Sequence, residues 1–467
     1  MNYENFNKTK IIVTLGPSTF DIGKIKKLIN IGVDVFRINF SHGTHKQYRK
    51  IVHKIKNYDD SVALMADLKG TEIRTCVKKK EGINLKEGDS LELVYDNENI
   101  DKNKFSLHYS NILDISKKGR HILVDDGRIE FEIIEVKKDR LKLKSLTNGV
   151  LKDRKSAHFV ETDVPFPLLT SQDKDDIEFA KQNDFDFVAA SMIKSEKEIY
   201  AIRGLLDDSM QLVAKIEHPD AVYNIDSIIE ASDMILVARG DLGVKMPITK
   251  VPVMQKNITE KACKAGKPVI IATQLLESMM ENPRPTRAEV NDIASAIFNK
   301  VDALMLTGET AAGKFPIESV EVLKEVVKNT ENSINYENYL KNIDVNKGNV
   351  SESISYAAVD ASYSLPAQAI LCFTSSGSTA RRVAKFRPSL PVFAFTQKDK
   401  VVRQLRGVFG VIPFKIGHFN SMDNMVDESK KILLEKNLIE PNNKIVITSG
   451  TPIGRTGTTN TIKIIDV

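Results

Sequence analysis

Two opposite charges close an apolar run near the middle of the chain. Residues 232–244 read SDMILVARGDLGV, in which Met234–Ala238 is followed by Arg239, Gly240 and Asp241. Three interpretations compete: an adhesion tripeptide on a loop, an ordinary turn with a surface ion pair, or the rim of an active site at the end of a buried strand. The tripeptide alone favours the turn, because Gly and Asp are common turn formers.

A second carboxylate, Glu217, ends the preceding apolar run. On neighbouring parallel strands, about 4.8 Å apart, Glu217 and Asp241 could share one cation. Mg²⁺ suits such a pair, because it usually takes one or two carboxylates and completes its shell with substrate oxygens and water. The alternative is two unrelated surface carboxylates.

Lys215 lies on the same strand face as Glu217, because a strand has a period of two. Its ammonium could stabilise charge on a transferring phosphoryl group or an enolate. The alternative is a plain ion pair with Glu217. Thr273 ends another run and offers a hydroxyl, unless that hydroxyl only satisfies the backbone.

A separate group of oxygens follows the second run, FRINFSHG. Arg37, Asn39 and Ser41 occupy alternate positions, and Asp67 at the end of the third run could join them. Arginine suits phosphate through bidentate contacts, and the oxygens suit a hard, weakly held cation. The alternative is a polar strand end that satisfies its own loop. His42 offers either an acid/base group or a positioned loop histidine.

The runs that carry these residues alternate with helix-like stretches. Continuous apolar strands between helices predict a parallel sheet buried on both faces. Eight such units suggest an α/β fold, a closed (β/α)₈ TIM barrel with its active site at the carboxyl ends of the strands. Thr286 followed by Glu289 fits a capping box at one helix start. The eight runs are Ile11–Gly16, Val33–His42, Val62–Lys69, Phe185–Ser191, Leu212–Glu217, Met234–Asp241, Pro268–Gln274 and Ala303–Glu309.

Two stretches depart from this alternation. The segment between Gly70 and the helix near Asp173 is too long for a loop, and its alternating apolar residues and frequent turns predict an inserted small β-barrel lid. The polar stretch from Thr330 to Ser353 predicts a connector to an open α/β domain. We therefore expect a barrel domain over 1–70 and 164–335, a lid domain over 71–163, and a C-terminal α/β domain over 350–467.

Composition is that of an ordinary globular protein. The chain has 467 residues, 42% hydrophobic and 28% charged, and a net charge of +5. So small a charge argues against a nucleic-acid partner but permits phosphorylated substrates. Three distant cysteines fit no metal or disulfide framework and indicate a reducing compartment. The polar start and the lack of a long apolar run predict a cytoplasmic protein with no membrane partner.

These groups predict phosphoryl transfer or enolate chemistry under a lid that excludes water. No Walker A loop is present, so nucleotide binding would not follow that plan. A Mg²⁺-dependent barrel lyase acting on pyruvate or phosphoenolpyruvate would need the same carboxylates, but neither the lid nor a second cation cluster. An adhesion protein would need the tripeptide on an exposed loop tip.

Nine runs in order resemble the signatures of the pyruvate kinase family. They are TKIIVTLGPST, DVFRINFSHGTH, DLKGTEIRT, VDDGRIE, AKIE, ILVARGDLGV, IATQLLESM, PRPTRAE and LTGETAAGKFP. The resemblance covers essentially the whole chain. It implies a barrel, an inserted β lid and a C-terminal α/β domain. It also implies transfer of phosphate from phosphoenolpyruvate to ADP, giving pyruvate and ATP.

The resemblance also implies roles for single residues. Lys215, Arg37 and Thr273 would be catalytic, and Glu72 predicts dependence on K⁺. An intact Lys215, Glu217, Asp241 and Thr273 disfavours an impaired relative that only binds an effector. The implied ligand sets are Glu217 and Asp241 for Mg²⁺; Asn39, Ser41, Asp67 and the carbonyl of Leu68 for K⁺; Arg37, Lys215, Gly240, Asp241 and Thr273 for phosphoenolpyruvate or pyruvate; and Asn39, Phe40, Ser41, His42, Arg74 and Lys155 for the nucleotide.

Several positions depart from the family pattern. Leu68 replaces a frequent Thr, Thr71 a Pro at the lid hinge, and Lys245 a common Glu. Residues 156–161, SAHFVE, replace the usual Gly-Val-Asn-Leu-Pro-Gly, and Gln47 stands where an aromatic residue sometimes occurs. These changes bear most on two expectations taken from the family, namely the closure of the lid and the position of Lys155.

The C-terminal domain resembles the part of the family that binds a phosphorylated activator, and relatives are typically homotetramers. Hydroxyls and backbone N–H groups at a helix start suit the phosphate of a sugar phosphate or nucleotide monophosphate. The alternative is two turns rich in Ser, Thr and Gly. The implied effector residues are Thr374, Ser375, Ser376, Gly377, Ser378, Thr379, Arg455 and Gly457.

Overall fold

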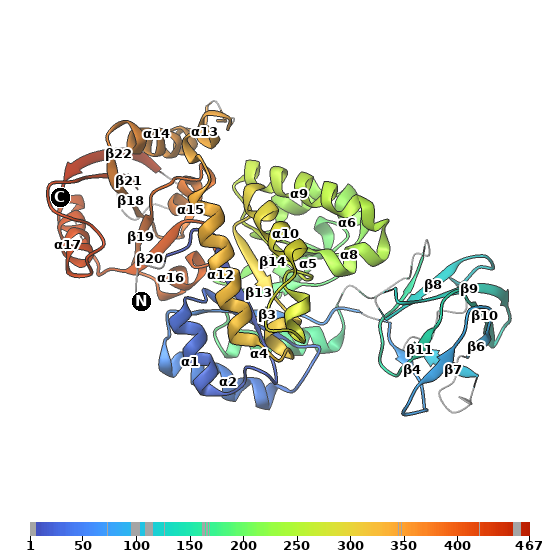
Figure 1. The fold of residues 1–467 in the computed structure, drawn as a ribbon. Coiled ribbons are helices and arrows are strands. Elements are labelled where there is room, and N and C mark those ends of the chain that lie inside the picture. The colour runs from blue at the N-terminus through green and yellow to red at the C-terminus, as the bar shows by residue number, and fades with distance from the viewer. Residues whose placement is uncertain are drawn as a thin grey trace.

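The chain folds into a barrel, an inserted β lid and a C-terminal α/β layer, arranged as Figure 1 shows. The lid stands away from one end of the barrel, and the C-terminal part packs on the opposite side. The computed structural model describes residues 6–71, 73–94, 103–107, 115–125, 127–160, 164, 167, 169–343, 345–346, 348–419, 421–451 and 459–467.

Eight parallel strands close into a barrel, which confirms the predicted TIM-barrel fold. They are almost continuously apolar because both faces are buried. Around the barrel their order is β1-β17-β16-β15-β14-β13-β3-β2. Their bounds are β1 (Lys10–Leu15), β2 (Val35–Asn39), β3 (Ala63–Asp67), β13 (Phe187–Ala190), β14 (Gln211–Ile216), β15 (Met234–Ala238), β16 (Val269–Ala272) and β17 (Ala303–Leu306).

Alternation along the strands decides which side chains reach the barrel axis. On β3, Ala63 and Met65 belong to the inner core, whereas Leu64 and Ala66 pack under the helices. The next inward position is Asp67, at the carboxyl end of the strand. The same parity directs Arg37 and Asn39 on β2, and Lys215 on β14, toward the axis.

The helices form the outer layer of the barrel, and in the described residues none combines the length and apolar character needed to cross a membrane. Several predicted runs extend past their strands. In particular, β15 ends at Ala238, and the tripeptide from Arg239 forms the first turn of α8. The helices are α1 (Ile22–Ile31), α2 (His45–Tyr58), α4 (Ser171–Gln182), α5 (Glu196–Arg203), α6 (Pro219–Tyr223), α7 (Ile225–Ala231), α8 (Arg239–Lys245), α9 (Val251–Ala265), α10 (Arg287–Phe298), α11 (Gly308–Ala311) and α12 (Pro316–Asn332), with 3₁₀ turns η3 (Ile248–Lys250) and η4 (Glu277–Met280).

The inserted segment is a β domain, as expected, with its own apolar core around Phe105 and Phe131. One sheet has the order β12-β8-β9-β10-β6-β7-β4, and a second pairs β11 with β5. Its strands are β4 (Thr75–Cys76), β5 (Ile83–Leu85), β6 (Ser90–Val94), β7 (Lys104–Leu107), β8 (His121–Val124), β9 (Ile129–Val136), β10 (Arg140–Ser145), β11 (Gly149–Leu151) and β12 (Ala157–Phe159).

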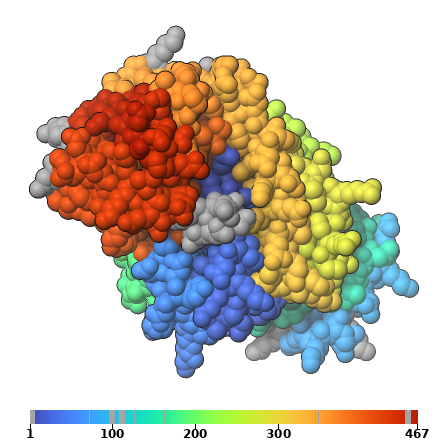
Figure 2. Space-filling model, turned by 60° about the vertical axis from the view of Figure 1, so that its left-hand side comes forward, coloured from blue at the N-terminus to red at the C-terminus, as the bar shows by residue number. Residues whose placement is uncertain are grey.

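The C-terminal part is a five-stranded sheet, β20-β19-β18-β21-β22, with an antiparallel last strand. It packs on the amino-terminal end of the barrel, beside α1 and α2 (Figure 2), with a cavity between the two parts. This cavity of about 960 Å³ is lined by residues of α1, α16 and β20. The elements are β18 (Ala367–Phe373), β19 (Val392–Thr396), β20 (Val411–Lys415), β21 (Lys444–Gly450), β22 (Thr459–Asp466), α13 (Tyr336–Lys341), α14 (Val350–Ser364), α15 (Ser378–Lys385), α16 (Asp399–Leu405) and α17 (Met422–Glu435).

Two features of this part were not expected. The polar stretch after Thr330 is not a plain connector, because Asn335 and Asn349 cap the starts of α13 and α14. The edge strand β20 was not predicted from the sequence, since its Pro413 argues against a strand; an edge position tolerates it.

The predicted capping box of α10 is present. Thr286 accepts from the N–H of Glu289, and Glu289 reaches back to the N–H of Thr286. We expect Thr286→Ala to lower the free energy of unfolding by about 1 kcal/mol, measured by urea denaturation. Ser295→Ala, at an exposed position inside the same helix, is the matched control and should leave it unchanged. Equal effects of the two changes would contradict the role of the cap.

Candidate active site

A cavity of about 1040 Å³ lies between the carboxyl ends of the barrel strands and the lid. The barrel contributes polar residues to it, and the lid contributes Ile73, Leu123, His158 and Phe159. The structure thus gathers eight of the predicted site residues under the lid. Those that line the cavity are Arg37, Asn39, Ser41, Asp67, Leu68, Lys215, Glu217 and Asp241.

Asp67 is the centre of the polar cluster and is only 1% exposed. Its Oδ2 accepts from Arg37 Nε at 2.6 Å, and its Oδ1 lies 3.1 Å from Lys215 Nζ. Burial alone would raise the pKa of the Asp67 carboxyl, but these two cations more than offset it and lower the pKa. Arg37 also donates to Thr14 Oγ1 at 2.8 Å, which fixes its guanidinium.

Lys215 is held by three oxygens at the cavity floor. Its Nζ lies 2.8 Å from Glu217 Oε1 and 2.7 Å from Ser191 Oγ, as well as near Asp67. Burial opposes its charge, but the carboxylates of Asp67 and Glu217 raise its pKa above the ordinary value. Lys215 therefore forms the ion pair with Glu217 and also lines the cavity.

Ser191 was not predicted as a site residue. Its hydroxyl donates to the Leu68 carbonyl at 2.8 Å while accepting from Lys215, so it connects the ends of two strands. The following residue, Met192, adopts φ +61° and donates its N–H to Glu217 Oε2 at 2.8 Å. The polar ending after the apolar run Phe187–Ala190 was the available signal.

Glu217 and Asp241 follow adjacent strands, β14 and β15, and line the same cavity. Within the described part of the chain, no three His, Cys, Asp or Glu side chains gather into a metal cluster. An ion held here would draw on two carboxylates and on substrate oxygens. That donor set fits Mg²⁺ better than an ion needing an all-protein cage.

The predicted second cation group is also gathered in the cavity, with its oxygens partly engaged. Asn39 Oδ1 accepts from the N–H of Ser41 at 3.0 Å, and the Leu68 carbonyl accepts from Ser191. The carboxylate of Asp67 is shared with two cations, as described above. These neutral and anionic oxygens suit a weakly held monovalent cation.

The adhesion interpretation is wrong, because Arg239 is buried at the start of α8. Its guanidinium pairs with Asp292 and donates to the carbonyls of Thr273 and Gln274. The N–H of Gly240 donates to Thr273 Oγ1 at 2.8 Å, and Thr273 Oγ1 donates to the Ala272 carbonyl. Among the described residues lining the cavity, neither Gly240 nor Thr273 appears.

Thr273 has φ +68°, a strained conformation for a β-branched residue. Such strain persists only where the surrounding structure imposes it, and it clusters at functional sites. Its hydroxyl bonds to the backbone of Gly240 and Ala272, as the alternative interpretation expected, and so connects the ends of β15 and β16.

The structure does not place the predicted nucleotide residues together. Arg74 donates to the Arg154 carbonyl, and Lys155 pairs with Asp125 at 2.7 Å, both within the lid. The ring of Phe40 is buried against Phe179 and other aromatic rings, and its N–H donates to the Asp67 carbonyl at 3.0 Å. His42 donates its N–H to the Asn39 carbonyl at 3.3 Å. Glu72 and Glu161 lie outside the described residues.

The lid adds two histidines, His121 and His158, that were not predicted as site residues. His158 lines the cavity, and burial, with Lys245 and His218 nearby, lowers its pKa to about 3. It is therefore neutral at physiological pH. Lys245 lies with its Nζ 3.0 Å from Met192 Sδ, and its ammonium adds a positive charge to this wall of the cavity.

The predicted effector loop, Thr374–Thr379, connects β18 to the start of α15. Gly377 has φ +81° at the helix N-cap, and the carbonyl of Ser376 accepts from Arg381. Thr379 shares a 2.8 Å hydrogen bond with Thr459. Ser375 and Ser378 belong to the same loop and helix start, whereas Arg455 and Gly457 lie outside the described residues.

Comparison with known proteins agrees with this architecture. Residues 6–320 match the family model "Pyruvate kinase, barrel domain", and residues 352–465 match "Pyruvate kinase, alpha/beta domain". The chain is 38% identical to pyruvate kinase of Clostridium perfringens over 98% of this chain and 99% of that one. It is 38% identical to pyruvate kinase of Geobacillus stearothermophilus over 98% of this chain and 80% of that one. The chain therefore belongs to the pyruvate kinase family, whose members are phosphotransferases.

Proposed function

We propose that this chain transfers phosphate from phosphoenolpyruvate to ADP, giving pyruvate and ATP. The observation that carries the proposal is the buried, charged Lys215 at the floor of the cavity under the lid. A fixed ammonium in a site that excludes water can stabilise the charge that develops on a transferring phosphoryl group. It needs no reorganisation, because Asp67, Glu217 and Ser191 already hold it.

The other residues would bind and orient the reactants. Arg37, fixed by Asp67 and Thr14, would contact the phosphate of phosphoenolpyruvate. The backbone at Gly240 and Asp241, with Thr273, would bind the enolate side of the substrate. For ADP we propose Asn39, Phe40, Ser41, His42, Arg74 and Lys155, the last two being carried over the site by lid closure.

Two cations would assist. Glu217 and Asp241 would hold Mg²⁺, which neutralises phosphate charge and orients oxygens for transfer. Asn39, Ser41, Asp67 and the carbonyl of Leu68 would hold K⁺, with Glu72 favouring that dependence. The oxygen donors already gathered at the rim support both assignments.

Regulation and assembly belong to the same proposal. We expect a cytoplasmic homotetramer, activated by a sugar phosphate or nucleotide monophosphate at Thr374–Thr379 together with Arg455 and Gly457. The hydroxyl-rich loop at the start of α15 supports this assignment. The domain limits we propose remain 1–70 and 164–335, 71–163, and 350–467.

Lys215→Met removes the charge while keeping most of the side-chain volume. We expect kcat for pyruvate formation to fall about 10²–10³-fold, because a preorganised charge at the transferring group is lost. Lys197→Met, at an exposed position on α5, is the control and should retain wild-type activity. A Lys215→Met enzyme with nearly normal kcat would contradict the assigned role.

Dependence on K⁺ tests the second cation site. We expect phosphoenolpyruvate-dependent ATP formation with ADP and Mg²⁺ to fall by about tenfold or more when K⁺ is replaced by an inert organic cation. Equal rates in both media would refute the K⁺ site and leave the kinase intact. Release of pyruvate and inorganic phosphate without ATP would show transfer of the phosphoryl group to water instead of ADP, and no activity in either medium would contradict the proposed function.

A further inference from the structure

Four aspartates form a regular ring at the amino-terminal end of the barrel, opposite the active site. Each immediately precedes a strand, and these are every second strand around the barrel. They are Asp34 before β2, Asp186 before β13, Asp233 before β15 and Asp302 before β17.

Each aspartate forms the same pair of hydrogen bonds with the start of the barrel strand that comes before its own along the chain. Its N–H donates to the carbonyl of one residue there, and its carboxylate accepts from the N–H of that residue. The carboxylate therefore joins the starts of two barrel strands. The donors are the N–H groups of Ile11 at 2.9 Å, Leu64 at 2.9 Å, Leu212 at 2.8 Å and Val269 at 2.9 Å.

The cations that compensate these carboxylates come from different parts of the chain. Asp233 pairs with Arg203 of α5 at 2.7 Å, inside the barrel domain. Asp34 lies 3.6 Å from Lys10 of β1. The other two pair with arginines of the C-terminal part, Asp186 with Arg403 at 2.7 Å and Asp302 with Arg387 at 2.9 Å.

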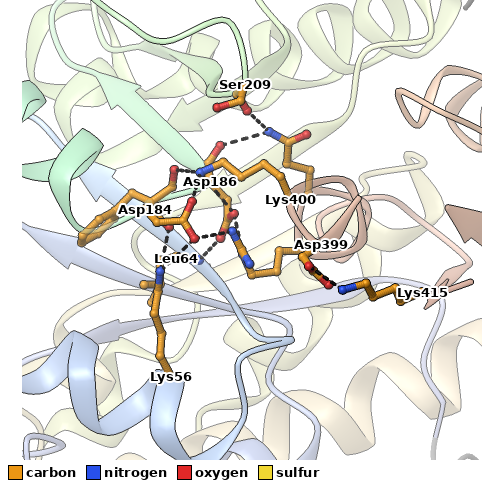
Figure 3. A network of polar contacts seen from close by, with 11 residues as sticks. Lys56, Leu64, Asp184, Asp186, Ser209, Asp399, Lys400 and Lys415 are labelled. Atoms are coloured by element: carbon orange, nitrogen blue, oxygen red, sulfur yellow. Dashed lines mark hydrogen bonds and ion pairs between the residues drawn. The ribbon is translucent and has the colours of Figure 1, made fainter. Parts of the chain in front are cut away.

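The Asp186 pair is the centre of a larger network, drawn in Figure 3. Asp186 is fully buried, and Arg403 also reaches Asp184 Oδ2 at 2.7 Å. Lys400 of the same helix, α16, lies 2.8 Å from Asp184 Oδ1, and Lys56 of α2 lies 3.0 Å from Asp184 Oδ2. Lys400 and Arg403 thus fix helix α16 to the barrel through ion pairs with Asp184 and Asp186.

The Asp302 pair is equally enclosed, with Arg387 only 3% exposed. Arg387 also donates to the carbonyl of Lys300 at 2.6 Å and stacks over the ring of Phe409 at 4.3 Å. The N–H of Phe409 donates to the other oxygen of Asp302 at 3.3 Å. Removal of Arg387 would leave the buried carboxylate of Asp302 without its cation, and removal of Arg403 would leave Asp186 only the more distant Lys400, at 3.7 Å. Both losses are unfavourable.

The strands that these carboxylates hold lead directly to the active site. β3 ends three residues after Leu64, at Asp67, and β13 is followed by Ser191. β16, which begins at Val269, is followed by the strained Thr273. Strands this short, paired on both sides in a closed barrel, transmit a shift at one end to the other.

We propose that Arg403 and Arg387 are positioning residues for the phosphoryl-transfer site. Arg403 acts through Asp186 on β3 and β13, and Arg387 acts through Asp302 on β16. The inference rests on the proposed function. It assigns the contact between the C-terminal part and the barrel a role in substrate and cation binding, in addition to its contribution to stability.

Arg403→Gln and Arg387→Gln test the two connections separately. We expect Arg403→Gln to raise both the KM for phosphoenolpyruvate and the K⁺ concentration for half-maximal activity about tenfold, with kcat changed less than about twofold. Arg387→Gln should raise the KM for phosphoenolpyruvate but not the K⁺ requirement, because Thr273 lies outside the K⁺ group. Isothermal titration calorimetry with phosphoenolpyruvate gives the same comparison without turnover.

Val401→Ala controls for lost stability, since Val401 is a buried residue of α16 outside the ionic network. It should lower Tm and leave both constants unchanged. If Arg403→Gln lowers Tm while both constants also stay unchanged, Arg403 is only structural and the proposal fails. Should Arg403→Gln not fold, Arg403→Lys is decisive: it keeps the charge but loses the fork that spans two carboxylates, and unchanged constants overturn the proposal. An inactive wild-type enzyme that binds no phosphoenolpyruvate would refute the proposed function instead.

Discussion

Arg37 and Lys215, from two different barrel strands, share the buried carboxylate of Asp67. In so enclosed a site an uncompensated charge costs about 3–5 kcal/mol, so none of the three can be removed without displacing the others. The arrangement fixes an ammonium and a guanidinium at the floor of the cavity before any substrate arrives. Ser191 and Glu217 complete the shell around Lys215, and the lid closes the cavity above it.

Hydrogen bonds also hold two of the strands beneath this site, β3 and β13, at their amino-terminal ends. Asp186 joins the starts of β3 and β13, and the carboxyl ends of those strands carry Asp67 and Ser191. A barrel strand of four or five residues leaves little room for independent movement of its two ends. The C-terminal part touches this opposite rim through Arg403, and so contacts strands whose other ends bear the active site.

The pattern of apolar and polar residues along the chain predicted most helices and strands but placed some of their boundaries wrongly. Apolar runs with polar endings predicted all eight barrel strands, because strands buried on both faces are predominantly apolar. The pattern missed one edge strand and the starts of two helices. Pro413 obscured the edge strand β20, and the polarity around Asn335 and Asn349 concealed two capped helix starts.

The sequence by itself determined the fold class and the chemical types at the barrel rim, since strand parity places Lys215 and Asp67 on the inward face. It also carried the family resemblance. Only the tertiary structure decided which groups meet. The hydroxyl of Ser191, the lid residue His158 and the ring of strand-joining aspartates all depend on contacts between residues far apart in the chain. Packing in three dimensions creates such contacts, and neither spacing nor periodicity along the chain encodes them.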